Sequence, residues 1–177
     1  MKKIFAILLT VTLLASMATV ASAAENTTTL TTTVPAATYT LNIPADKEIT
    51  FGATSSDLGN VTITDATGFA EKKNLQVTVS YSDFECPNNS TTIPMLLYAE
   101  TENRNLIVNI NSGDILTFYG RTGGSVTECA QIRRGETNEK YAMTNLELRV
   151  NSEDWGKALG GEYSATITFT CEVVVEQ

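Results

Sequence analysis

The end of the chain carries the pattern that most constrains the fold. From Tyr163 to Val173, apolar side chains occupy every second position and polar or small side chains occupy the positions between them. Successive side chains of a strand point to opposite faces, so this alternation predicts a long strand with one face in a core and the other in water. A slip of one residue would exchange the two faces, so the register of this strand must be well defined.

Shorter alternating segments recur through the rest of the sequence. They occupy residues 39–43, 60–64, 74–81, 93–98, 105–110, 115–119 and 141–150, with a short piece at 48–52. Clusters rich in Gly, Asp and Ser separate them, including residues 54–57 and 111–114, and such residues favour turns. The turn at 111–114 lies between two apolar runs, so it predicts a hairpin of residues 105–110 with residues 115–119.

Helical periodicity is confined to one predicted turn. Residues 120–140 are charged and glycine-rich, and we expect a long loop there with one short strand at most. At residues 152–155 we expect a single helical turn that Ser152 caps, with the Trp155 ring packed over one end of the core. Many short strands separated by turns predict an all-β, antiparallel, immunoglobulin-like β-sandwich. It would form a single domain over residues 39–177, with seven to nine strands.

The first 23 residues have the composition of a secretory signal peptide. Two lysines follow the initiating methionine, an apolar run occupies residues 4–20, and Ala21-Ser22-Ala23 forms an A-x-A cleavage site. A membrane anchor is the alternative, but the unbroken apolar stretch is too short for one. We therefore predict a signal peptide over residues 1–23 and a mature chain of 154 residues from Ala24. This chain would be secreted or displayed at the cell surface, without membrane insertion.

Threonine dominates residues 24–38. Threonine is β-branched and favours extended chain, so this arm suits a flexible leader, a first strand, or a segment that pairs with a partner. The last possibility would allow self-assembly by strand addition.

The acidity of the chain narrows the choice of partner. The net charge is −8, and removal of Lys2 and Lys3 with the signal peptide changes it to −10. A negative surface repels phosphate backbones and anionic membranes, so we expect no nucleic-acid partner.

Several kinds of catalytic site are excluded by residue type. The chain has no histidine, and this excludes catalysis by a Ser-His-Asp or Cys-His arrangement and most kinds of zinc site. It also has no nucleophile-elbow, phosphate-loop, dinucleotide or EF-hand motif. The 20 acidic residues are scattered over predicted loops, so a pair of carboxylates placed for glycoside hydrolysis is not indicated. We predict no enzyme, no cofactor and no metal site.

The three cysteines lie in two kinds of segment. Cys86 and Cys129 lie in irregular, turn-like stretches. Export would bring them into an oxidising environment, so we predict a disulfide between them. Cys171 lies on the apolar side of the last strand and is predicted to be a free core thiol. Metal binding by three cysteines without a CxxC pair is not favoured.

Aromatic residues are the candidates for ligand contact. Tyr98, Phe118 and Trp155 are expected to pack in the interior, whereas Tyr119 must point to the face opposite Phe118. Tyr119 is therefore the possible ligand contact, in a site for carbohydrate or another ligand.

Two segments resemble known exported proteins. Residues 158–170, from Ala158-Leu159-Gly160-Gly161 through the alternating threonines, resemble the last strand of bacterial pilin-like subunits and of surface proteins with immunoglobulin-like domains. Residues 39–64 are similar to secreted proteins of the same kind. The chain departs from chaperone-assembled pilins after this strand, where residues 171–175 continue it. The resemblance implies a sandwich fold and a structural or adhesive role with a protein or glycan at the cell surface. A secreted ligand-binding module is the alternative.

Overall fold

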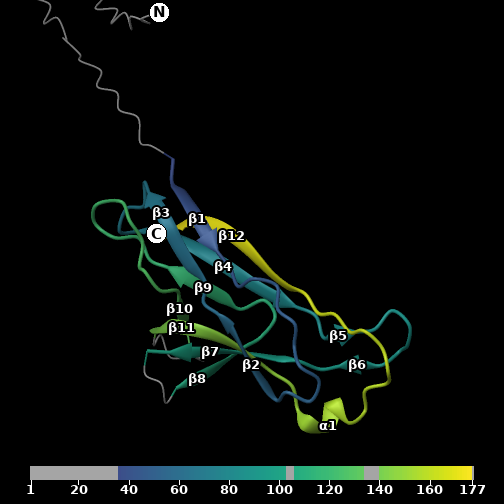
Figure 1. Cartoon of the computed structure of the whole chain (residues 1–177). Coiled ribbons are helices and arrows are strands. Elements are labelled where there is room, and N and C mark those ends of the chain that lie inside the picture. Colours follow the sequence, from purple (N-terminus) through teal and green to yellow (C-terminus); the bar gives the residue numbers. More distant parts are fainter. Residues whose placement is uncertain (1–35, 103–105, 134–139, 177) are drawn as a thin grey trace, which may run out of the picture. The chain divides into compact units, whose positions relative to one another are not determined.

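The protein is all-β, with antiparallel sheets, as the alternation predicts. The computed structural model describes residues 36–102, 106–133 and 140–176, which belong to one compact unit (Figure 1). The predicted signal peptide and most of the threonine-rich arm lie outside the described residues. The first described strand begins at Thr38, one residue before the expected start of the domain at Tyr39.

The described residues contain twelve strands and one short helix, joined by turns and loops. In chain order these are β1 (Thr38–Asn42), β2 (Ser55–Gly59), β3 (Thr62–Thr67), β4 (Lys73–Tyr81), β5 (Phe84–Glu85), β6 (Thr92–Ile93), β7 (Leu96–Thr101), β8 (Ile107–Ile110), β9 (Ile115–Phe118), β10 (Gln131–Arg133), β11 (Lys140–Arg149), α1 (Ser152–Trp155) and β12 (Ile167–Val175). The count differs from the expected seven to nine because several strands, such as β5 and β6, are only two or three residues long.

One large antiparallel sheet organises these strands. Its order is β12-β4-β9-β10-β11-β7-β8, and β2 joins it by pairing with the second half of β11. Two small sheets accompany it, β1 with β3 and β5 with β6. β4 lies between β12 and β9 (Figure 1) and pairs with both.

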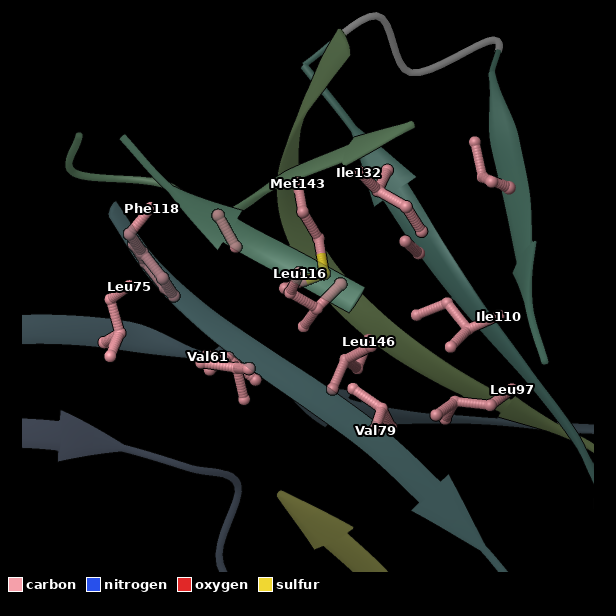
Figure 2. Close-up of a cluster of buried hydrophobic side chains, with 14 of the residues drawn as sticks. Val61, Leu75, Val79, Leu97, Ile110, Leu116, Phe118, Ile132, Met143 and Leu146 are labelled. Carbon is pink, nitrogen blue, oxygen red and sulfur yellow. The ribbon is translucent and has the colours of Figure 1, made fainter. Parts of the chain in front are cut away.

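The main core covers the inner face of the large sheet. Leu75, Val77 and Val79 of β4 point into it, as the alternation of residues 74–81 predicts. Figure 2 shows Leu75 and Val79 in this core together with side chains of β7, β8, β9 and β11. The fully buried members with the largest side chains include Phe69, Phe118, Leu97, Ile110, Leu116, Met143 and Leu146. Tyr39 and Leu41 of β1 pack against the same core, so the β1–β3 ribbon covers part of this face.

A second core lies around α1. Trp155 is 8% exposed and packs with Phe84, Ile93, Met95, Leu148 and Val150, as expected of a residue that closes one end of the core. The predicted cap differs, since Asn151 occupies the N-cap position, makes no side-chain capping bond, and Ser152 is already helical. The indole N–H of Trp155 instead donates to the carbonyl of Ala53 at 2.8 Å.

Two predicted local structures are wrong. Residues 48–52 form no strand, and residues 55–57 of the turn predicted at 54–57 lie instead within β2, where pairing with β11 holds an Asp- and Ser-rich segment extended. The Asp57 carboxylate accepts hydrogen bonds from the N–H of Gly59 at 2.7 Å and the side chain of Asn145 at 2.9 Å. The bond to Gly59 is of the Asx-turn kind, and it accompanies the shift in register between β2 and β11 at this point.

The expected hairpin of residues 105–110 with 115–119 is also wrong. β8 pairs with β7, and β9 pairs with β4 and β10, so the turn between β8 and β9 crosses to another part of the sheet. β4 holds that turn in place. The N–H of Val79 donates to the carbonyl of Asp114 at 2.9 Å, and the carbonyl of Val79 accepts from the N–H of Gly113 at 2.7 Å.

The two faces of β9 predict a clear difference in stability. Leu116 is fully buried and its neighbour Ile115 is 44% exposed. Leu116→Ala leaves a cavity and should lower the free energy of unfolding by about 2–5 kcal/mol, whereas Ile115→Ala should change it by about 0.5 kcal/mol. Urea unfolding followed by circular dichroism measures both. Equal losses would contradict the placement of these faces.

Candidate functional site

The outer edge of β12 is the longest regular feature that the fold leaves unpaired in the described part of the chain. β12 pairs with β4 over nine consecutive positions, from Ile167 opposite Tyr81 to Val175 opposite Lys73, with no bulge. No described strand pairs with its other side.

Hydrogen bonds at both ends of β12 fix the direction of its backbone groups. Ser82 donates to the carbonyl of Thr166 at 3.1 Å, and Glu176 donates to the carbonyl of Lys72 at 2.8 Å. Hydrogen-bonded pairs alternate along an antiparallel ladder, so the even-numbered residues of β12 are those that bond to β4. The odd-numbered residues therefore direct their N–H and C=O groups away from β4: Ile167, Phe169, Cys171, Val173 and Val175.

Most of these odd-numbered residues also have apolar side chains turned to the core. Ile167, Phe169, Cys171 and Val173 are half-buried against it. Val175 ends the strand and is 66% exposed. The intervening Thr168, Thr170 and Glu172 are exposed on the outer face. An added strand would thus meet free backbone groups and an apolar inner face together.

Cys171 contacts the ribbon that covers the core. Burial raises the pKa of the Cys171 thiol, and a hydrogen bond from the hydroxyl of Tyr39 on β1 acts in the opposite direction. Burial also raises the pKa of Tyr39, with a further contribution from Cys171. The Cys171 thiol therefore stays protonated near neutral pH. It is a free, half-buried thiol, less buried than a core residue, at the centre of β12.

A shallow groove on the outer face contains the predicted ligand contact. It has a volume of about 310 Å³, and its lining includes Gln76, Asp114, Thr117, Tyr119 and Glu176. Phe118 is fully buried while Tyr119 is half-exposed, in line with the opposite faces expected for them. The ammonium group of Lys140 lies 3.9 Å from the centre of the Tyr119 ring, which places a cation over one face of the ring.

The other aromatic candidates are engaged elsewhere, and one exposed aromatic was missed. Tyr98 carries the guanidinium of Arg149 over its ring at 4.6 Å. Phe51 is 73% exposed and contacts Trp155 edge-on, with 5.4 Å between ring centres. It borders a pocket of about 270 Å³ beside Leu159 and Tyr163. The sequence signal for Phe51 was hidden because residues 48–52 were expected to form a strand.

The structure differs from the predicted cysteine pairing. Cys86, Cys129 and Cys171 are all free, with no bond between Cys86 and Cys129. Cys86 is buried beside Gly161, where a β-carbon would lie 2.6 Å from the sulfur. Cys129 instead lies opposite Thr62 in an isolated bridge. The two cysteines therefore have different neighbours, which the turn-like sequences around them do not reveal.

Among the residues described, no three His, Cys, Asp or Glu side chains gather as a metal-binding group. No helix of the described segments is long and apolar enough to span a membrane. Comparisons with known proteins return no matching family model, no similar curated protein and no similar solved structure.

The contact between β1 and β12 predicts a change in thiol titration. Tyr39→Phe removes the hydrogen bond that lowers the pKa of Cys171, so the pKa of that thiol should rise further. We expect the midpoint of the pH dependence of Cys171 alkylation by iodoacetamide to move upward. A Cys129→Ser background removes the other half-buried thiol. Thr40→Ala, on the exposed side of β1, is the control. An unchanged midpoint in Tyr39→Phe would contradict the contact.

Proposed function

We propose that this protein is a non-catalytic subunit of the cell surface, structural or adhesive, that joins a partner by strand addition along the outer edge of β12. The proposal rests on one observation, the nine-residue edge that no described strand covers. In strand addition, main-chain hydrogen bonds provide affinity and alternate side chains provide register.

The character of this edge supports binding. Monomeric proteins protect edge strands with proline, lysine, bulges or short length. β12 has no proline or lysine, its register is regular, and its only charged residue is Glu172. The opposite edge of the sheet, β8, has only the four residues Ile107–Ile110.

The finer fold and the family resemblance belong to the same proposal. An immunoglobulin-like sandwich is supported by the β1–β3 ribbon, which packs against a core that β4 and β12 also line. The segments that resemble pilin-like proteins, 39–64 and 158–170, include most of β1, all of β2, part of β3 and the first four residues of β12. The resemblance therefore falls on the proposed edge and on the ribbon beside it.

Export and composition agree with a surface role. The predicted signal peptide over residues 1–23 would deliver the chain to the secretory route. A chain without histidine lacks the commonest general base, which supports a binding rather than a catalytic role. A protein or glycan at the cell surface is the proposed partner, and residues 24–38 are one candidate for the added strand.

Proline at position 173 tests the edge. The N–H of Val173 points away from β4, so Val173→Pro should keep the β4 ladder intact while removing one outward donor and placing a ring in the path of an added strand. We expect surface retention and self-association to weaken by about tenfold or more. Retention is measured by immunoblotting of cell-surface and medium fractions, and self-association by light scattering after size-exclusion chromatography.

Val173→Ala is the matched control, since it loses similar packing but keeps the N–H. It should retain association, and circular dichroism should report the same folded state for both variants. If Val173→Pro and Val173→Ala behave alike, strand addition at β12 is wrong.

The Tyr119 groove favours a second candidate function, a secreted module that binds a carbohydrate or other small ligand. Its amide, hydroxyl and carboxylate groups surround an aromatic side chain, the combination found in polar ligand sites. A glycan array should then yield a ligand whose binding Tyr119→Ala weakens by about tenfold. Tyr98→Ala, an aromatic outside the groove, is the control. The absence of any binding glycan would leave this candidate without support.

A further inference from the structure

We propose that the strand added to β12 is β12 of a second copy, paired antiparallel about a two-fold axis through Cys171. This inference rests on the proposed function of the edge and names its partner. Two large sheets would then continue into one another across the dimer.

The direction of the backbone groups restricts the register. Only odd-numbered residues offer N–H and C=O groups to the outer side, so odd-numbered residues of one copy must face odd-numbered residues of the other. A two-fold axis must then pass through a residue, since an axis between two residues would pair odd with even positions.

Length and charge select among the remaining registers. An axis through Cys171 pairs the whole of Ile167–Val175 with itself, because Cys171 is the central residue of the nine. An axis through Thr170 leaves the end of β12 outside the paired strand. An axis through Glu172 sets the two Glu172 carboxylates directly opposite each other, and like charges at that position are unfavourable.

Side chains match in the register through Cys171. On the inner face, Phe169 lies opposite the partner's Val173 and Ile167 opposite the partner's Val175, so the 66% exposed side chain of Val175 gains an apolar neighbour. On the outer face, Glu172 lies opposite the partner's Thr170, and no like charges meet. Five residue pairs can each exchange two main-chain hydrogen bonds.

The threonine-rich arm matches the edge of β12 less well than a second β12 does. The inner face beside β12 is apolar, and an added strand in register should contribute apolar side chains to it. Residues 27–33 read Thr-Thr-Thr-Leu-Thr-Thr-Thr, so either face of that segment carries one apolar residue at most. A second β12 contributes Ile, Phe, Cys and two Val side chains to the same face.

Cysteines on the outer face can report this register. In the proposed pairing, position 170 of one copy faces position 172 of the other as a non-hydrogen-bonded pair, with Cα atoms about 4.5 Å apart, which suits a disulfide. Full-length chains carrying T170C or E172C, each with C129S and C171S, are produced with their natural processing. Each variant by itself, and an equal mixture of the two variants, is treated with oxidised glutathione. The products are then separated by non-reducing electrophoresis.

We expect cross-linked dimer in the mixture and in the double variant T170C/E172C, and little in either single variant alone. A dimer mass by light scattering for the unmodified protein is also expected. Cross-linking of T170C alone, or of E172C alone, would overturn this register. Cross-linking in no sample would overturn the β12 dimer.

A chain lacking residues 24–35 separates the two possible strand donors. The β12 dimer predicts that this deletion leaves cross-linking in the mixture unchanged, and loss of cross-linking would overturn the inference in favour of the arm. The broader function is tested separately. If no dimer forms but Val173→Pro still reduces surface retention relative to Val173→Ala, the β12 edge binds another partner. In that case only the present inference fails.

Discussion

The structure depends on a geometric coupling within β-strands: side chains and backbone hydrogen-bonding groups alternate with the same period of two. In β12 this coupling gives the odd-numbered residues two properties at once, apolar contact with the core and N–H and C=O groups turned away from β4. The core fixes which side chains turn inward, and in doing so it fixes which backbone groups lie on the outer edge. The proposed interaction surface is thus a consequence of how the interior packs.

β4 transmits this constraint to the rest of the sheet. Its even-numbered residues bond to β12, and its odd-numbered residues bond to β9 and to the turn around Gly113 and Asp114. The same odd-numbered residues, Leu75, Val77 and Val79, are fully buried. The outer face of β4 and β9 is then polar apart from Ile115, and Gln76 and Thr117, opposite each other in the ladder, become part of the Tyr119 groove. The edge and the groove are therefore two results of one arrangement of strands.

Sequence reasoning succeeded where the alternation within a segment shows which of its side chains are buried. β1, β3, β4, β11 and β12 lie within or close to the segments predicted from alternation, and Trp155 closes one end of the core as expected. It failed where a distant strand determines local structure. Ser55–Gly59 has the composition of a turn but is extended by pairing with β11. The turn at 111–114 suggests a hairpin, yet β8 and β9 have different partners. Tyr119 was identified because Phe118 must point inward, whereas Phe51 was missed because residues 48–52 were expected to form a strand.

The sequence by itself determined the all-β class, the positions of the main strands and, in strands such as β4 and β12, the residues that face the core, because period-two alternation is a local property of side chains. Only the tertiary structure decided which strands are neighbours, and with that the position of β12 at one end of the sheet, of Cys86 beside Gly161 and of Cys129 opposite Thr62. The physical reason is that main-chain hydrogen bonds are the same for every pair of strands. The hydrogen bonds of the ladder therefore do not select which strands pair. Neighbours are selected by the packing of side chains far apart in the chain, such as Leu75 against Phe118 and Leu97 against Ile110.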